Sequence, residues 1–147
     1  MTARVPIGVV GVGALGQHHA KHLATLPDAE LIGVYDHNPT RAREIAAQAS
    51  TTAFHDLDDL LARVKAVTIA VPTPSHLSVG LQVLERGIAA LMEKPLAQTV
   101  AEADALIAAA RAKGVQLQVG HIERFNPALS ALQQMPIRPK YLSAERL

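Results

Sequence analysis

Residues 9–16 read VVGVGALG, in which Gly11, Gly13 and Gly16 form a G-x-G-x-x-G turn. An apolar run precedes the turn, a helical pattern follows it, and Asp36 comes 20 residues after Gly16. This is the context in which such a turn binds a dinucleotide. Gly11 permits the tight turn, Gly13 lets a pyrophosphate approach the backbone, and Gly16 lets the helix pack closely on the strand. The alternative is a tight structural turn with no ligand, and the context favours the dinucleotide.

Asp36 ends the second predicted strand, where a carboxylate can accept hydrogen bonds from the ribose hydroxyls of an adenosine. The same negative charge repels a ribose 2′-phosphate, which favours NAD over NADP. Arg41 and Arg43 follow closely and leave NADP open, and His37 is ambiguous. The pattern therefore predicts NAD, with NADP as the alternative.

Two hydrophobic periodicities alternate along the chain. Short runs rich in Val and Ile predict buried strands at residues 5–10, 30–35, 66–71, 88–92 and 115–119. Helical patterns lie at residues 15–26, 39–48, 57–62, 76–86, 100–112 and 125–133. Strand–helix alternation with short connections predicts an α/β fold, a Rossmann doubly wound parallel sheet in a single domain.

The predicted helix ends carry local signals. Asn38 can cap a helix whose first position is Pro39. Thr99 and Glu102 fit a capping box, and Gly114 fits the left-handed residue that ends a helix.

Composition excludes several classes of protein. Of the 147 residues, 49% are hydrophobic, which is enough for a core and argues against disorder. A net charge of +1 gives no reason to expect a nucleic acid or membrane partner. There is no cysteine, so disulfides, thiolate metal sites and cysteine nucleophiles are excluded. No signal peptide and no apolar run of membrane-spanning length is recognisable, so we expect a soluble, cytoplasmic protein.

His18, His19 and His22 form a cluster at the start of the first predicted helix. His18 and His22 are four residues apart, the spacing of a zinc-binding helix. However, His19 stands where a metalloprotease needs a glutamate, and no third ligand can be named. We therefore predict a polar helix face and no metal.

The last residues have a different character. Residues 133–140, QQMPIRPK, carry two prolines and are typical of a linker, and residues 141–147, YLSAERL, look like the start of a strand. We predict a dinucleotide-binding domain at residues 1–134, with a linker and the start of a truncated C-terminal domain at 135–147. The alternative is an additional edge strand on the same sheet.

Five motifs occur in order: GVGALGQHHA, VYDHNPTRA, AVPTPSHLSVGLQVLERG, EKPLAQTVAEADAL and VGHIERFNPAL. Together they resemble the N-terminal domain of the Gfo/Idh/MocA oxidoreductases, the family of glucose-fructose oxidoreductase and inositol dehydrogenase. The resemblance covers nearly the whole chain. Full-length members carry a second α/β domain that holds most substrate contacts, and that domain is absent from this sequence.

The resemblance implies roles for particular residues. Lys94 of the E-K-P motif matches the catalytic lysine that contacts the reacting hydroxyl, and Glu93 matches the residue beside the nicotinamide ribose. The alternative for Lys94 is a surface ion pair with Glu93. His121 and Arg124 match positions that face the substrate. The predicted cofactor-binding residues are Gly11, Gly13, Ala14, Leu15, Gly16, Asp36, His37, Arg41, Val71, Pro72, Thr73, His76, Glu93 and Lys94.

The resemblance also implies an activity. We expect the cofactor domain of an NAD-dependent oxidoreductase that transfers a hydride between NAD and a hydroxyl of a sugar, nucleotide-sugar or cyclitol. The motif GHIERFNPA most resembles the sequences of members that act on nucleotide-activated amino sugars such as UDP-N-acetylglucosamine. The resemblance implies a homo-oligomer for the full-length protein. The alternative is a non-catalytic NAD-binding or redox-sensing module, which would need no lysine beside the nicotinamide.

Overall fold

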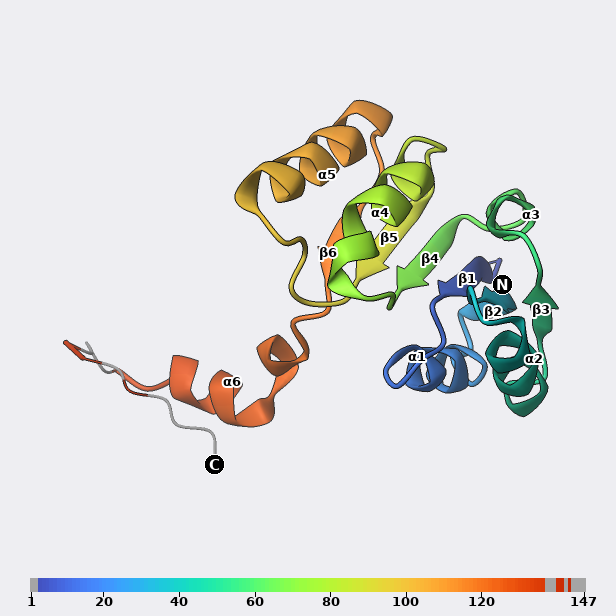
Figure 1. Cartoon of the computed structure of the whole chain (residues 1–147). Helices are drawn as coiled ribbons and strands as arrows, with labels where there is room; N and C mark the ends of the chain where they lie inside the picture. Colours follow the sequence, from blue (N-terminus) through green and yellow to red (C-terminus); the bar gives the residue numbers. More distant parts are fainter. Residues whose placement is uncertain (1–2, 137–139, 142, 144–147) are drawn as a thin grey trace.

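The computed structural model describes residues 3–136, 140–141 and 143. Within them, six strands form one parallel sheet in the order β3-β2-β1-β4-β5-β6, with helices on both faces (Figure 1). The strands are β1 Val5–Val10, β2 Ala29–Tyr35, β3 Thr52–Phe54, β4 Ala66–Ile69, β5 Ala89–Met92 and β6 Leu117–Val119. The α-helices are α1 Gly16–Leu23, α2 Pro39–Gln48, α3 Leu57–Leu61, α4 His76–Leu84, α5 Val100–Lys113 and α6 Pro127–Gln133. The predicted doubly wound α/β fold is confirmed.

The two faces of the sheet have separate hydrophobic cores. Alternate residues of β4 and β5, such as Ile69 and Met92, are fully buried in a cluster with residues of α3, α4 and α5. On the other face, Val9 and Val34 pack in a second cluster with α1 and α2. The strands are rich in apolar residues because the two faces of the sheet are covered by different sets of helices.

The three local signals at Asn38, Thr99 and Gly114 are confirmed. The Asn38 side chain accepts the backbone N–H groups of Thr40 and Arg41 at the start of α2. The Thr99 hydroxyl accepts the N–H of Glu102 at 3.2 Å, and Gly114 ends α5 with φ +65°. Each of these interactions joins neighbours in the chain, so sequence spacing alone was enough to predict them.

Most predicted elements are shifted by one or two residues at an end, and three depart from the prediction by more than that. β3 was missed because it has three residues, none buried, and lies at the sheet edge beside β2. The first helix ends at Leu23 rather than residue 26, since the Thr25 hydroxyl donates to the carbonyl of His22 and Pro27 follows. The predicted helix 125–133 is divided into a 3₁₀ helix, η2 (Ile122–Phe125), and α6, because Asn126 is extended and caps the N–H of Ala128.

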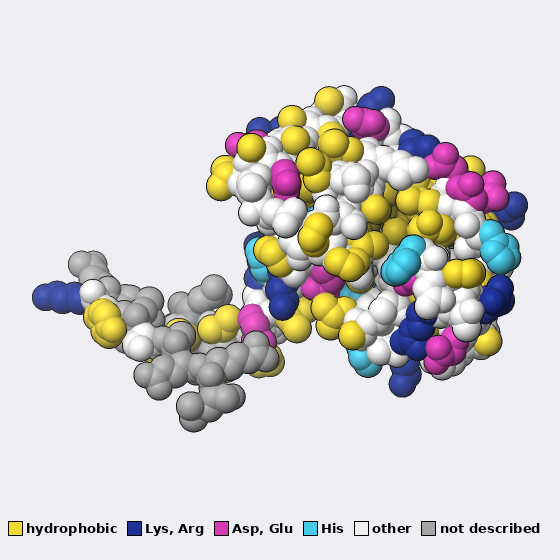
Figure 2. Space-filling model, viewed as in Figure 1, with side chains coloured by type: hydrophobic (Ala, Val, Ile, Leu, Met, Phe, Trp, Pro, Cys, Tyr) yellow, Lys and Arg dark blue, Asp and Glu magenta, His cyan; other side chains and the backbone are white. Residues whose placement is uncertain are grey.

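The segment containing α6 projects from the body of the domain (Figure 1). Its large apolar side chains are exposed, among them Phe125, Leu129 and Met135. On the face of the body seen in Figure 2, basic and acidic side chains are interspersed rather than gathered by sign. The predicted linker and strand start at 135–147 fall largely outside the described residues, so that division stays a prediction. In the described part of the chain, no helix has the length and apolar character to cross a membrane.

Candidate cofactor site

The carboxyl ends of five strands form one row. The strand registers join Tyr35 to Val10, Val10 to Ile69, Ile69 to Met92, and Met92 to Val119. The ladder continues one residue further, because the next N–H groups also donate to the adjacent strand: Gly11 to Tyr35, Ala70 to Val10, Glu93 to Ile69 and Gly120 to Met92, at 2.8–2.9 Å. The strand order reverses between β1 and β4, and doubly wound sheets bind their ligands at that point of the row.

The three glycines of the turn have different surroundings. Gly11 has φ +82°, and a Cβ there would stand 2.9 Å from the backbone of Ala70, so any side chain would be strained. A Cβ on Gly16 would overlap the carbonyl oxygen of Gly11, so α1 can approach the turn only with glycine. At Gly13, no atom of the described residues other than Gly13 and its two chain neighbours lies within 4 Å of the Cβ position. Gly13 therefore leaves open space in which a ligand can approach the backbone.

Two charged side chains hold the residue between the first glycines. The Val12 N–H donates to Oδ2 of Asp36 at 2.8 Å, and its carbonyl accepts from Nε of Arg41 at 3.0 Å. The other oxygen of Asp36 accepts the N–H of Asn38 at 2.9 Å and lies 3.2 Å from Nδ1 of the exposed His37. Asp36 thus supports the turn in addition to standing at the end of β2.

The Arg41 guanidinium donates hydrogen bonds to three other residues of the protein. Besides Val12, its guanidinium donates to Oε2 of Glu44 and to Oε1 of Gln17, each at 2.9 Å. Arg43 is exposed and donates to the Thr40 hydroxyl at 3.3 Å. The arginine nearest the turn therefore serves as a tie between α2 and α1.

A hollow of about 560 Å³ lies over this edge of the sheet. Its volume falls within the usual range of small-molecule sites, roughly 300–1,000 Å³. The predicted cofactor residues in its wall are Gly11, Gly13, Ala14, Leu15, Asp36, His37, Val71 and Pro72. It also includes residues that sequence reasoning missed, among them Tyr35, Ser75 and Gln82. Ser75 adjoins the predicted His76 and could have been inferred from that neighbour.

Two of the helices that begin beside the hollow, α1 and α4, are not capped by side chains. Leu15 precedes α1 and Ser75 precedes α4, both line the hollow, and neither makes a side-chain cap. The other α-helices all have capping side chains, namely Asn38, Asp56, Thr99 and Asn126. The unpaired N–H groups and positive dipole end of a helix start suit the phosphates of a dinucleotide.

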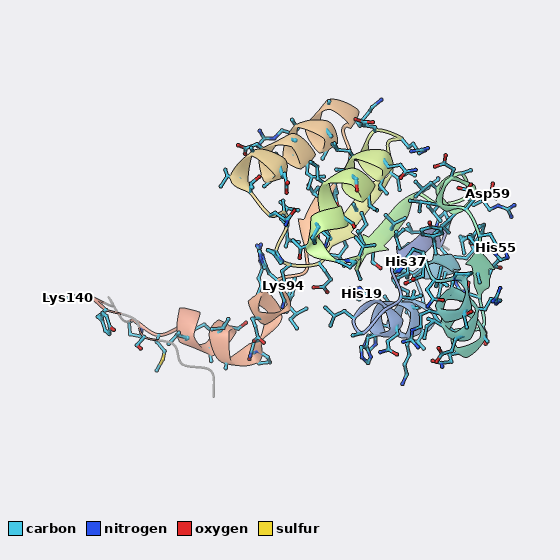
Figure 3. The ribbon with its side chains drawn as sticks, viewed as in Figure 1. His19, His37, His55, Asp59, Lys94 and Lys140 are labelled. Atoms are coloured by element: carbon cyan, nitrogen blue, oxygen red, sulfur yellow. The ribbon has the colours of Figure 1, made fainter. Side chains whose placement is uncertain are left out.

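The loop after β5 carries Glu93 and Lys94, and the Lys94–Pro95 peptide bond is cis. Oε1 of Glu93 lies 2.9 Å from Nε2 of His19, and Oε2 accepts the backbone N–H of Lys94 at 3.2 Å. Among the described residues, no salt bridge involves the Lys94 ammonium. The predicted alternative, a surface ion pair between Glu93 and Lys94, is therefore not formed. Figure 3 shows His37, His19 and Lys94 along the same side of the molecule.

The histidine cluster proved more specific than a polar helix face. His18 and His22 are exposed, whereas His19 turns inward to Glu93. No group of three or more potential metal ligands occurs among the residues that the structure describes. The sequence could not single out His19, because its partner lies 74 residues away.

His76 lies inside the protein rather than in the wall of the hollow. Its side chain is 1% exposed, with Nδ1 2.9 Å from the carbonyl oxygen of Pro95 and Nε2 3.0 Å from that of Val71. The ring therefore joins the loop after β4 to the loop that carries Lys94. Thr73 belongs to the short 3₁₀ helix η1 (Thr73–Ser75), just beyond Pro72 of the hollow.

His121 and Arg124 lie past the end of β6. They line a second hollow, of about 480 Å³, together with Gln118 and Phe125. Gly120, which joins this segment to the sheet, is bonded to Met92 beside Glu93. The fold thus brings the two predicted substrate residues to the same end of the sheet as the Lys94 loop.

Comparison with known proteins identifies the class. Residues 5–121 match the model of the Gfo/Idh/MocA oxidoreductase family, described as an NAD-binding Rossmann fold. The chain belongs to this family, and its cofactor is NAD.

Two curated relatives show which members of the family this chain resembles in sequence. The chain is 44% identical over 141 residues to a UDP-N-acetylglucosamine 3-dehydrogenase of Acidithiobacillus ferrooxidans, covering 95% of this chain and 44% of that protein. It is 36% identical to an inositol 2-dehydrogenase of Rubrobacter xylanophilus, covering 89% of this chain and 39% of the relative.

Solved structures of related dehydrogenases have the same fold as this chain. The Acidithiobacillus ferrooxidans UDP-N-acetylglucosamine 3-dehydrogenase has a TM-score of 0.86 at 41% identity, covering 90% of this chain and 43% of that one. GenD2 of gentamicin A biosynthesis, solved in complex with NAD, has a TM-score of 0.78 at 34% identity, covering 82% and 35%. The chain spans less than half the length of the curated relatives it matches.

Proposed function

We propose that this chain is the cofactor domain of a dehydrogenase that transfers a hydride between NAD and a hydroxyl group of a nucleotide-activated amino sugar. The observation that carries the proposal is the arrangement along one sheet edge: the hollow with Asp36 at one end, and the Lys94 loop beside it. The relative with 44% identity is named for UDP-N-acetylglucosamine, and the family also includes enzymes named for inositol. Other sugars and cyclitols are the broader substrate class.

The residues present fit a bound NAD. The open backbone at Gly13 and the uncapped starts of α1 and α4 would receive the pyrophosphate. Asp36 would accept hydrogen bonds from the adenosine ribose, beside His37. Val71, Pro72 and Thr73 would contact the nicotinamide half. His76 would act from the interior by holding the loops after β4 and β5 together.

The charges near Asp36 support NAD rather than NADP. A 2′-phosphate would face the Asp36 carboxylate at the end of β2. The side chain of Asp36 is 8% exposed. Arg41, the cation best placed to offset that repulsion, is occupied with Val12, Glu44 and Gln17. An NADP-selective site would need to release this arginine.

Lys94 would serve as the catalytic residue. When bound, NAD supplies the acceptor for the hydride that leaves the substrate carbon. The hydroxyl oxygen must pass its proton to a base or to solvent water in the same conversion, so negative charge develops there. The Lys94 ammonium, which no described carboxylate pairs, can stabilise that charge and hold the oxygen in place.

His121 and Arg124 would contact the rest of the substrate. Arginine presents a planar set of N–H donors that suits a phosphate, and the diphosphate of a nucleotide-sugar offers that partner. The hollow that contains Arg124 adjoins the end of β6. Cytoplasmic location and self-association of the full-length protein remain predictions from the sequence and the family resemblance.

Cofactor binding is tested by calorimetric titration of the 147-residue chain with NAD and with NADP. We expect NAD to bind with at least about ten-fold higher affinity, a difference of ~1.4 kcal/mol. No heat of binding with millimolar NAD, or tighter binding of NADP, would contradict the assignment.

Turnover is tested in a chimera in which this chain replaces the matching residues of the Acidithiobacillus ferrooxidans enzyme. We expect NADH to form from NAD and UDP-N-acetylglucosamine, and the K94A chimera to lose far more activity than NAD affinity. Full activity after K94A would favour the non-catalytic NAD-binding module.

A further inference from the structure

The two carboxylate oxygens of Glu93 have different hydrogen-bond partners. One oxygen is held by α1 through His19, at 2.9 Å, and the other accepts the backbone N–H of Lys94 at 3.2 Å. The two side chains are mostly buried, with 21% of His19 and 12% of Glu93 exposed. The carboxylate is therefore fixed at both oxygens, by contacts that do not include the lysine ammonium.

Packing against β6 restricts Glu93 further. A Cβ on Gly120 would stand 3.3–3.4 Å from the carboxylate atoms of Glu93, so the group lies against the backbone at this point. Glu93 itself is bonded to the sheet through its N–H, which donates to Ile69. Among the described contacts that hold the carboxylate, the His19 ring alone comes from a side chain, so it can be removed without altering the sheet.

Adjacent glutamate and lysine side chains at a crevice attract each other. Without a competing partner, the Glu93 carboxylate would turn to the Lys94 ammonium, since no other described ion pair engages that ammonium. Such a pair would occupy the group that the proposed chemistry needs. His19 supplies the competing partner.

We propose that His19 is a positioning residue that holds the Glu93 carboxylate away from Lys94 and so keeps the lysine ammonium available. The inference rests on the proposed function for its importance in catalysis, but the geometry it asserts is independent of NAD binding. His19 also links α1 to the loop after β5, and the start of α1 faces the proposed phosphate end of the hollow.

The test measures how fast Lys94 is acetylated in the 147-residue chain, by peptide mass spectrometry after brief treatment with an acetylating reagent. Lys113, exposed at the end of α5, is the internal reference. In H19A we expect Lys94 to react about two- to five-fold more slowly relative to Lys113, the effect of a partly exposed ion pair. In H19Q, whose amide nitrogen can reach Glu93, the wild-type ratio should return.

A second background separates this mechanism from a general loosening of the loop. In E93Q the amide cannot form an ion pair, so adding H19A should leave Lys94 reactivity unchanged. H18A, an exposed change on the same helix, is the matched control and should label as wild type. If H19A is too unstable at the labelling temperature, H19N, which is too short to reach Glu93, takes its place.

Two outcomes would overturn the proposal. One is a wild-type labelling ratio in folded H19A or H19N. The other is a slowing of the same size in the E93Q background, which would show that His19 does not act through Glu93. Neither outcome depends on whether the chain binds NAD, so failure of this inference is distinct from failure of the proposed function.

Discussion

The backbone N–H of Val12 donates to Oδ2 of Asp36 at 2.8 Å, across 24 residues of sequence. This bond ties the glycine-rich turn to the end of β2. Asp36 supports the turn, and in the proposed site its charge would also face the cofactor ribose, so a single substitution would remove both roles together. Separating those roles needs two substitutions rather than one.

Replacing Asp36 with Ser should shift cofactor preference towards NADP, because the charge that repels a 2′-phosphate is lost. It should also lower the free energy of unfolding by about 1–3 kcal/mol, because the N–H groups of Val12 and Asn38 lose their acceptor. The ratio of NAD to NADP affinity comes from calorimetry, and the stability from urea unfolding.

D36N is the control for this prediction. The amide oxygen can still accept one of the two N–H groups, so stability should fall less than in D36S, while the preference should shift in the same direction. An unchanged NAD to NADP ratio in both variants would show that the Asp36 charge does not select the cofactor.

Alanine at Gly16 should lower stability, whereas alanine at Gly13 should lower NAD affinity with little change in stability. G16A forces a Cβ onto the carbonyl oxygen of Gly11 and should cost about 1–3 kcal/mol of stability. At Gly13 the space is open among the described residues, so G13A should change stability by less than about 0.5 kcal/mol. Its methyl group would nevertheless stand where the pyrophosphate approaches, so NAD affinity should fall.

Thermal melting and NAD titration of both variants check this pair. A G13A chain that is as stable as wild type and binds NAD equally well would show that the open space at Gly13 is not used by the cofactor.

Thr68 in β4 has a buried hydroxyl with no hydrogen-bond partner among the described residues. T68V keeps the branched shape and removes the unsatisfied oxygen, so it should raise the free energy of unfolding by about 1 kcal/mol. T68S keeps the hydroxyl and removes the methyl group, and should lower it by roughly 0.8 kcal/mol. Urea unfolding midpoints give the order T68V above wild type above T68S, and a less stable T68V would mean that the hydroxyl has a partner.

His76 joins the loops after β4 and β5 through the carbonyl oxygens of Val71 and Pro95. H76A should cost about 2–4 kcal/mol, because it empties a buried site and leaves the carbonyl oxygen that accepts the ring N–H without its partner. Hydrogen exchange, followed by mass spectrometry, should become faster in the peptide that spans residues 93–99. S78A, on the exposed side of α4, should leave that peptide unchanged. Wild-type exchange rates in folded H76A would exclude this role.

Some of the fold could be predicted because its signals are local. The caps at Asn38 and Thr99 join residues within a few positions of each other, and the apolar runs of β1 and β4 are visible in any window. The short β3 escaped prediction because its three residues become a strand only by pairing with β2. This pairing is a tertiary contact, so no short window of sequence reveals it.

The same division applies to the site. The glycine spacing and Asp36 predicted a dinucleotide turn from sequence, since each residue type answers a requirement of that turn. The roles of His19, His76 and Arg41 did not emerge, because each depends on a partner brought close by folding: Glu93 at 74 residues, Pro95 at 19 and Val12 at 29. Arg41 was predicted beside the cofactor, yet its guanidinium is bonded to the turn and to α1.

The sequence by itself determined the class of fold, the turn that receives a dinucleotide and the presence of a lysine after β5. These follow from periodicity, glycine spacing and charge, which are properties of neighbours in the chain. The tertiary structure alone decided which side chains face one another at the sheet edge. The parallel register aligns the ends of β4, β5 and β6, and α1 crosses beside them, so the Glu93 carboxylate meets His19 while the Lys94 ammonium stays unpaired among the described residues.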